Sequence, residues 1–404
     1  MGKKLIDAIT SLKLTVICLV IAMILVFVGT LAQVELGLYE TQKVYFRSLF
    51  IYWGPEGSDF KIPVLPGGYL LGTVLLVNLI GAHIKRFKFT KKKSGIFLTH
   101  LGLIVLLLGQ FFTEVFQVES FMRIHEGQVK NYTEADRLSE LVIIDTTDAE
   151  KDKVVAIPER MLKEGATFEE QMPFKVEIKA WFPNSLPGIG APKDTGPDVI
   201  TASHGMGRNG YFRKEPVGRS MDSRNIPAAK LAVTDASGQT STWIVSAWLS
   251  DETLVGHVAD QFGDRWLNLV EADQRLPVGN QTYKFALRQK RYYKNYSIEL
   301  EDFRHDLYKG TDIPKNFSSR VHIQNAKTNE KRESLIYMNH PLRYEGETYF
   351  QASFDPNDPH VTVLQVVRNP SWLAPYLSCI LVGIGLTVQF GIHLFSFIKK
   401  RRQA

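Results

Sequence analysis

Cysteine is nearly absent from this chain of 404 residues: there are two, Cys18 and Cys379, and each lies within a long apolar segment. The polar middle of the chain therefore has neither a disulfide nor a reactive thiol of its own. A C-x-x-C-H run is also missing, so the chain is not itself a c-type cytochrome. The histidines of the polar middle show no H-x-x-x-H or H-E-x-x-H spacing, and a metal site is not indicated there.

Charged residues are missing from four stretches, at residues 14–32, 69–84, 95–112 and 372–398. At about 1.5 Å per residue, the first, third and fourth cover roughly the 30 Å hydrocarbon layer of a bilayer. The second is shorter, but residues 62–68 before it are nearly apolar, and their two prolines indicate an interfacial approach to a span. The sequence therefore predicts four transmembrane helices.

Acidic residues are scarce in the short segments that flank these stretches. The two ends of the chain and the connection KRFKFTKKK (85–93) together hold thirteen basic residues against the single acidic Asp7. The rest of the chain holds 35 basic and 41 acidic residues. Because Lys and Arg collect in short cytoplasmic segments, both ends and this connection are predicted to be cytoplasmic. The net charge of +6 then reflects membrane topology, and nucleic-acid binding is not indicated.

About 255 residues between the third and fourth apolar stretches show the period-two alternation of half-buried strands. Strands are expected at residues 141–146, 174–178, 230–234, 242–248, 283–288, 319–324, 348–354 and 360–367. An antiparallel sandwich or an open barrel fits this pattern best. The predicted organisation is three transmembrane helices in residues 1–116, an extracytoplasmic β-rich domain in 117–370, and a fourth helix with a basic cytoplasmic tail in 371–404.

One segment of this domain, residues 183–228, is rich in Gly, Pro, Ser and Asn and has no clear period. It is either a long mobile loop or an ordered binding insertion, and the sequence leaves both open. Its GMGRNG run (205–210) matches the dinucleotide fingerprint only formally, because neither the preceding strand nor the following helix is indicated.

Three histidines fall within or at the ends of apolar stretches, where an ionisable group is costly and suggests a function. His100 and His393 lie at similar distances from the nearest flanking lysine, which places both about 10 Å into the cytoplasmic leaflet, and His83 is shallower. Such a set could supply neutral imidazole ligands to haem iron, with the adjacent basic connection receiving the haem propionates. Alternatively, each histidine forms an ordinary hydrogen bond between helices.

The chain resembles the ResB family of system II cytochrome c biogenesis proteins over nearly its whole length. The resemblance rests on SLKLTVICLVIAMILVFVGTLAQ (11–33), SGIFLTHLGLIVLLLG (94–109), NFSSRVHI (316–323), YMNHPLRYEGETYFQASF (337–354) and VVRNP (366–370). Eight residues of the fourth segment fall at the family's spacing: Asn339, Pro341, Leu342, Tyr344, Gly346, Tyr349, Gln351 and Ser353.

This resemblance implies a non-catalytic subunit of a haem-attachment complex, with a CcsA-type multispan partner. The complex would carry haem b as a transient cargo across the membrane and present it with apocytochrome c for thioether formation. The family's membrane histidine maps onto His100, which is the candidate axial ligand to the haem iron. The partner, His83 or His393 would supply the other ligand. The domain outside would hold apocytochrome c, and one means is to pair an extended peptide with a sheet edge.

A membrane-anchored module that binds an extracytoplasmic ligand without haem is the alternative function. It explains the topology, but not three histidines beside a basic connection. The expected location is the inner (plasma) membrane of a cell, with a thylakoid membrane an equal match to the pattern.

Overall fold

The computed structural model describes residues 2–54, 60–86, 90–148, 150–218, 224–270, 274–311, 314–355 and 358–403. The chain divides into two compact units. The helical unit contains Met1–Val118 and Arg368–Ala404, and the β unit contains Glu119–Gly218 and Ser223–Val367.

The helical unit holds the four predicted apolar helices. Its elements are α1 (Gly2–Ile9), α2 (Leu12–Thr41), a π-helical turn (Gln42–Phe46), β1 (Phe50–Trp53), β2 (Ile62–Pro66), α3 (Gly68–Arg86), a 3₁₀ turn (Lys91–Lys93), α4 (Ser94–Phe116) and α7 (Ala374–Gln403). Four helical segments, Leu12–Phe46, Gly68–Lys85, Lys91–Phe116 and Ala374–Gln403, are long and apolar enough to cross a membrane. The four helices are thereby confirmed, and their insertion into a bilayer stays a prediction. The predicted approach at 62–68 is a strand, β2, paired with β1.

Asn78 of α3 fixes this helix to the start of α2. Its amide nitrogen donates to the carbonyl oxygens of Ile9 and Ser11, at 2.6 and 3.1 Å, and its amide oxygen accepts from the Thr15 hydroxyl at 2.6 Å. The side chain is only 3% exposed. A polar group inside an apolar bundle is tolerated when partners across the helices satisfy it, as they do here.

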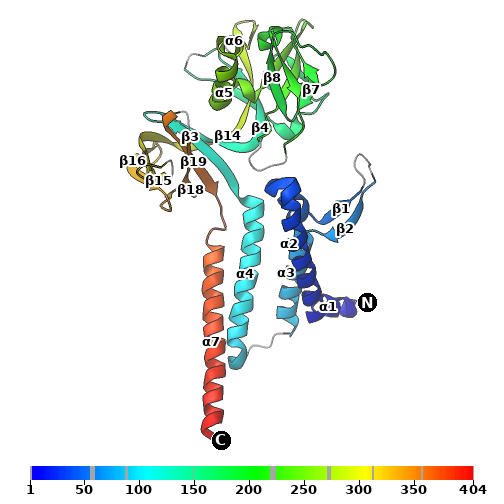
Figure 1. Cartoon of the computed structure of the whole chain (residues 1–404), viewed down its shortest axis with the longest axis vertical. Coiled ribbons are helices and arrows are strands. Elements are labelled where there is room, and N and C mark those ends of the chain that lie inside the picture. Colours follow the sequence, from blue (N-terminus) through cyan, green and yellow to red (C-terminus); the bar gives the residue numbers. More distant parts are fainter. Residues whose placement is uncertain are drawn as a thin grey trace. The chain divides into compact units, whose positions relative to one another are not determined.

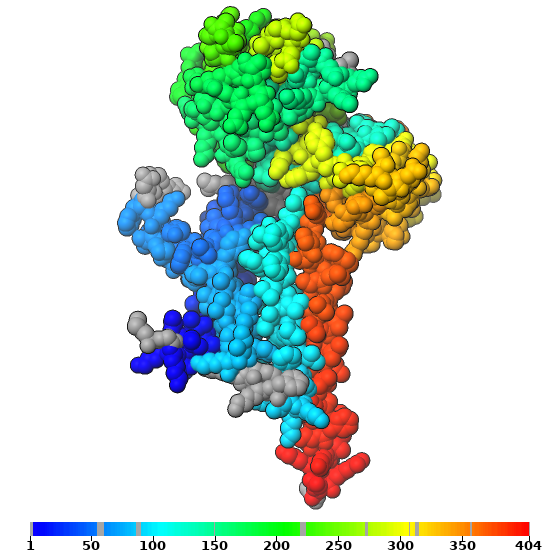
Figure 2. All heavy atoms as spheres, turned by 180° about the vertical axis from the view of Figure 1, so that it is seen from behind, coloured from blue at the N-terminus to red at the C-terminus, as the bar shows by residue number. Residues whose placement is uncertain are grey.

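Helices α4 and α7 lie side by side, as Figures 1 and 2 show from opposite directions. Three glycines of α4 spaced seven residues apart, Gly95, Gly102 and Gly109, are buried along this contact. A Cβ atom at Gly102 would lie 2.7 Å from Val382 Cγ2, and one at Gly109 would lie 2.3 Å from the Ala374 Cβ. The two backbones therefore approach closely because α4 carries glycine at these positions, as is common in membrane bundles.

The β unit is built mainly from antiparallel strands. Its largest sheet has the order β16-β15-β14-β4-β3-β19-β18-β17, with β13 and β5 added to β14 and β4. The strands of this sheet are β3 (Val118–His125), β4 (Val129–Asp145), β5 (Lys153–Pro158), β13 (Arg275–Val278), β14 (Gln281–Leu307), β15 (Pro314–Asn325), β16 (Glu330–Tyr337), β17 (Leu342–Tyr344), β18 (Glu347–Asp355) and β19 (Asp358–Arg368).

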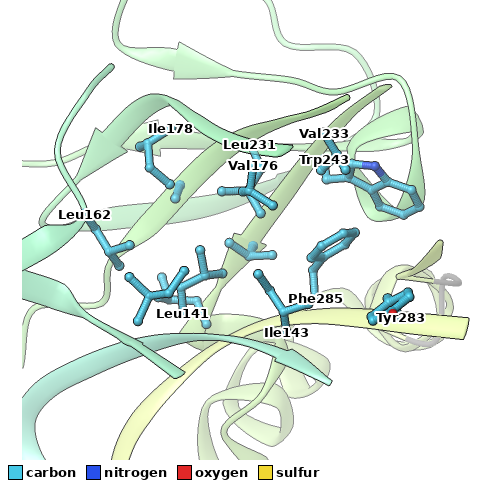
Figure 3. Close-up of a cluster of buried hydrophobic side chains, with 14 of the residues drawn as sticks. Leu141, Ile143, Leu162, Val176, Ile178, Leu231, Val233, Trp243, Tyr283 and Phe285 are labelled. Atoms are coloured by element: carbon cyan, nitrogen blue, oxygen red, sulfur yellow. The ribbon is translucent and has the colours of Figure 1, made fainter. Parts of the chain in front are cut away.

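A second sheet has the order β12-β11-β7-β6 and covers part of the first. Its strands are β6 (Thr167–Phe168), β7 (Lys175–Phe182), β11 (Ala228–Thr234) and β12 (Thr240–Ser246). Side chains from the two sheets interdigitate in one buried core, in which Ile143 and Phe285 of the large sheet meet Val176, Leu231 and Trp243 of the small one (Figure 3). This half of the unit is the predicted sandwich.

The other half of the large sheet curves around a separate core. That core takes side chains from β3, β14, β15, β16, β17, β18 and β19, among them Met122, Leu300, Val321 and Tyr349. A sheet whose strands all send residues into one shared core resembles an open barrel. The β-rich prediction is confirmed, and both proposed architectures occur, joined by the long strands β4 and β14.

The segment 183–228 is largely an ordered insertion rather than a long loop. It contains β8 (Ser185–Ile189), β9 (Val199–Ile200), a 3₁₀ turn (Gly205–Arg208) and β10 (Gly210–Lys214). Met206 and Phe212 are fully buried, in a core shared with α5 (Glu252–Phe262) and α6 (Asp264–Val270). The GMGRNG run is this 3₁₀ turn and the start of β10, so it does not open a helix and the dinucleotide interpretation is rejected.

The glycine face of α4 generates a first prediction. Gly102→Leu should lower the free energy of unfolding of the detergent-purified protein by about 1–3 kcal/mol, and with it the midpoint temperature of unfolding. The reason is that the added side chain overlaps Val382 and Ser378 of α7. The midpoint of loss of the monodisperse peak on size-exclusion chromatography after heating measures this effect. The matched control is Gly383→Leu on α7, where a Cβ would have no neighbour within 4 Å. Equal midpoints for the two variants would contradict the packing described here.

Candidate functional site

Two of the three predicted site histidines meet between α3 and α4. The imidazole rings of His83 and His100 have centroids 5.8 Å apart and planes at 86° to each other. Phe97, one turn before His100, places its ring 5.0 Å from that of His83. Both histidines are half-buried. The pair thus forms a small aromatic cluster at the end of α4 that follows the basic 3₁₀ turn.

The basic connection is partly described. Lys91, Lys92 and Lys93 form the exposed 3₁₀ turn directly before α4, and His100 lies about 9 Å further along the helix axis from Ser94. Lys85 forms an ion pair with Asp7 of α1. Residues 87–89 of the connection lie outside the described residues. Three ammonium groups are therefore close in sequence to the histidine pair and open to a ligand.

His393 does not join the pair, and the expectation that it shares the depth of His100 is wrong. Its Nε2 lies 2.9 Å from Nε2 of Gln389, and Gln389 packs against Gly95. His100 lies five residues from Gly95 along α4, and His393 lies four residues from Gln389 along α7 in the opposite direction. The two histidines are therefore separated by roughly 14 Å along the bundle. The sequence estimate failed because α7 extends beyond the level at which α4 begins, so Lys399 and Lys93 do not mark the same plane.

The far end of the same α3–α4 contact carries a polar cluster that the sequence analysis did not identify. The Tyr69 hydroxyl donates to Glu114 Oε1 at 2.8 Å, and Arg47 Nε lies 3.2 Å from the same oxygen. A largely apolar cavity of about 520 Å³ lies beside this cluster, between the two helices. The open backbone at Gly72, where a Cβ would meet nothing within 4 Å, forms part of it.

Seven-residue spacing links the two ends of this contact. His83, Leu76 and Tyr69 follow one another at intervals of seven on α3, and His100, Leu107 and Glu114 do so on α4. Residues seven apart lie on nearly the same face of a helix, two turns apart. This spacing was the sequence signal that could have led from the histidines to Tyr69 and Glu114.

Two neighbouring buried tyrosines of the β unit, Tyr296 and Tyr349, have a structural role. Tyr349 is completely buried, and its hydroxyl lies 2.7 Å from that of Tyr296. Both hydroxyls reach Glu347 Oε2, at 3.2 and 2.8 Å. Burial raises the pKa of both phenols, so both remain protonated donors at neutral pH. Among the described residues no group of three or more His, Cys, Asp or Glu side chains is arranged to hold a metal ion.

Two comparisons with known proteins bear on these sites. Residues 254–363, from α5 to β19, match the model of the ResB-like family. Over 321 residues, or 78% of this chain, the sequence is 27% identical to protein NrfI of Wolinella succinogenes. The chain spans about 29% of the length of that relative. Together they confirm the resemblance of this chain to the ResB family, with the family match itself lying in the β unit.

Proposed function

We propose that this chain is a subunit of a cytochrome c biogenesis complex that handles haem as a transient cargo at the His83–His100 pair. The ResB-like match and the similarity to protein NrfI support a role in cytochrome c biogenesis. The contact between two imidazole rings from two neighbouring apolar helices carries the haem part of the proposal. A helix that served only as an anchor would gain nothing from two costly side chains placed together.

The donor set fits haem iron. Neutral imidazole nitrogen is a common axial ligand of haem. The rings of His83 and His100 lie 5.8 Å apart between two apolar helices, and each brings imidazole nitrogen to the same place. Either or both would hold the iron, with a CcsA-type partner supplying a ligand where only one of them does.

The lysines that precede α4 suit the propionates of haem. Haem carries two propionates, and the exposed ammonium groups of Lys91, Lys92 and Lys93 precede α4 at the end where the histidines lie. Ammonium groups bind such carboxylates through charge-assisted hydrogen bonds. His393 is removed from the candidate ligand set, because its place on α7 is roughly 14 Å from His100 along the bundle.

In this proposal the four apolar helices cross the inner membrane, or a thylakoid membrane, and the β unit lies outside the cytoplasm. Haem collected near the cytoplasmic face would pass to the partner, and the β unit would present apocytochrome c for thioether formation. This chain would act as a non-catalytic subunit. The membrane-anchored binding module without haem is the competing function, and purified protein without a Soret absorption band, alone and with its partner, would favour it.

The membrane orientation can be tested in a cysteine-free background with single cysteines. Lys214→Cys in β10 should react with an impermeant maleimide in intact cells, and Lys92→Cys should react only after the membrane is permeabilised. The reason is the basic residues that flank the helices, which predict a cytoplasmic location for the 85–93 connection. Labelling in the reverse order would refute the orientation.

The haem ligand can be tested by His100→Ala in the full chain co-purified with its partner. Loss of an outer-shell partner of a metal ligand typically costs 10–100-fold in metal affinity, so removing a ligand should lower the recovered haem roughly tenfold or more. Loss of a mere hydrogen bond between helices would cost only about 0.6–2 kcal/mol of stability. The pyridine haemochrome assay measures the haem, and added imidazole should partly restore it.

The matched control is His393→Ala, the same substitution at the histidine that lies apart from the pair. It should leave haem content near that of the unsubstituted protein. His83→Ala separates the two modes of ligation, because it lowers haem as strongly as His100→Ala only if both imidazoles bind iron. Full haem content in His100→Ala at normal expression would show the assignment to be wrong.

A further inference from the structure

The hairpin of β1 and β2 exposes apolar side chains on both of its strands. Five of them are between 41% and 65% exposed: Ile62, Phe50, Val64, Tyr52 and Trp53. Among residues 48–54 and 60–67, the part of this segment that the structure describes, Lys61 is the only charged residue, and the sequence of the connecting turn adds Glu56 and Asp59. An apolar surface gathered on one small element marks a contact with a membrane or with another protein.

The base of this hairpin lies at the level of the apolar part of α2. The π-helical turn after α2 packs back against it, and a Cβ atom at Gly29 would lie only 2.9 Å from Cζ of Phe46. Ile51 of β1 is buried in one core with Leu25 of α2. Gly29 and Leu25 both belong to the uncharged stretch 14–32. The hairpin therefore leaves the helical unit beside the part of α2 that is apolar enough to cross a membrane.

The base is also tied to the polar cluster at the far end of the α3–α4 contact. The Gly67 backbone nitrogen donates to the backbone oxygen of Leu49 at 2.9 Å, and the Tyr69 nitrogen donates to that of Ser48 at 3.2 Å. The Tyr69 hydroxyl bonds Glu114, which comes two residues after the uncharged stretch of α4 ends. Tyrosine and charged residues at the ends of apolar helices are typical of the boundary between hydrocarbon and headgroups. From this level the hairpin extends sideways, away from the helices (Figures 1 and 2).

The chemistry of the hairpin suits such a boundary. Two of the five residues of β2, Pro63 and Pro66, have no N–H group, so this edge strand has fewer unpaired donors. Unpaired backbone groups are costly in hydrocarbon and are tolerated where water or headgroups can reach them. The side chains of Tyr52 and Trp53 favour the same layer, because an apolar ring carries an O–H or N–H group that reaches water. A two-stranded hairpin is only marginally stable in water, so a lipid surface would also stabilise it.

The surroundings at this level favour lipid over protein as the occupant of the apolar surface. Phe27 and Leu31, two residues to either side of Gly29, are 65% and 59% exposed on α2. Exposed apolar side chains of a membrane-spanning helix face acyl chains. The hairpin presents the same kind of side chain at the same level, so one lipid layer would cover both.

We propose that β1 and β2 form an interfacial hairpin whose apolar side chains contact lipid at the extracytoplasmic surface of the membrane, with Tyr52 and Trp53 at the headgroups. The inference rests on the proposed function, in which the four apolar helices cross a membrane. Its consequence is an anchor for α3, which begins two residues after β2 and has the shortest of the four candidate spans, at 18 residues. A span that is short for the hydrocarbon layer depends on its flanking residues for its depth, so the hairpin would hold His83 at the level of His100.

The test places single spin-labelled cysteines in a cysteine-free full chain reconstituted into lipid nanodiscs. Val64→Cys reports on the hairpin, Val26→Cys on the apolar part of α2, and Val154→Cys on β5 of the β unit; these valines are 55%, 54% and 39% exposed. Oxygen concentrates in lipid and a neutral nickel chelate stays in water, so power saturation in electron paramagnetic resonance measures contact with each. The ratio of oxygen to nickel accessibility at Val64 should be several-fold higher than at Val154 and should approach that at Val26.

Tyr52→Cys on the paired strand should give the same result, which excludes a local effect of one label. A water-like ratio at Val64 together with a lipid-like ratio at Val26 would overturn the hairpin inference and leave the proposed function standing. Shielding of Val64 from both reagents would also overturn it, because another protein chain would then cover the surface. A water-like ratio at Val26 would refute membrane insertion itself, on which both proposals rest.

Discussion

The close contact of α4 with its two neighbours is the constraint on which the helical unit depends. One face of α4 carries Gly95, Gly102 and Gly109 and admits the backbone of α7. Another carries His100, Leu107 and Glu114 and meets α3. Because Gly95, Gly102 and Gly109 leave room for the residues of α7 that pack against them, this pair of helices has little freedom to slide or rotate. The direction in which His100 points is therefore fixed by the contact of these three glycines with α7.

Much of the fold was predictable because it is periodic. The apolar helices and the eight expected strands follow from run length and period-two alternation. The helices α5 and α6 were missed, although Asp251 caps α5 by accepting from the backbone nitrogens of Thr253 and Leu254. They interrupt a stretch dominated by strand patterns, and at eleven and seven residues they are too short for a convincing period. The insertion at 183–228 is held by buried residues such as Met206 and Phe212 rather than by any repeat.

The candidate site was predictable in its chemistry but not in its assembly. A histidine in an apolar helix is conspicuous in sequence, and both His83 and His100 were recognised as candidates. Which histidines meet depends on how far each helix extends past the bundle, and flanking lysines do not record this. Arg47, Tyr69 and Glu114 escaped notice because they come from three separate segments, and only helix packing brings the last two together.

The ResB-like match and the proposed sites lie largely in different parts of the chain. Residues 254–363 form the second half of the β unit, whereas His83 and His100 lie in the helical unit. Within the match, Tyr344 and Tyr349 are buried, and the Gln351 side chain bonds the Ser319 and Thr362 hydroxyls at 2.6 and 2.8 Å. These residues stabilise the open-barrel half of the sheet, so their spacing identifies a fold. The chemistry must be argued from the α3–α4 contact, where His83 and His100 meet between two apolar helices.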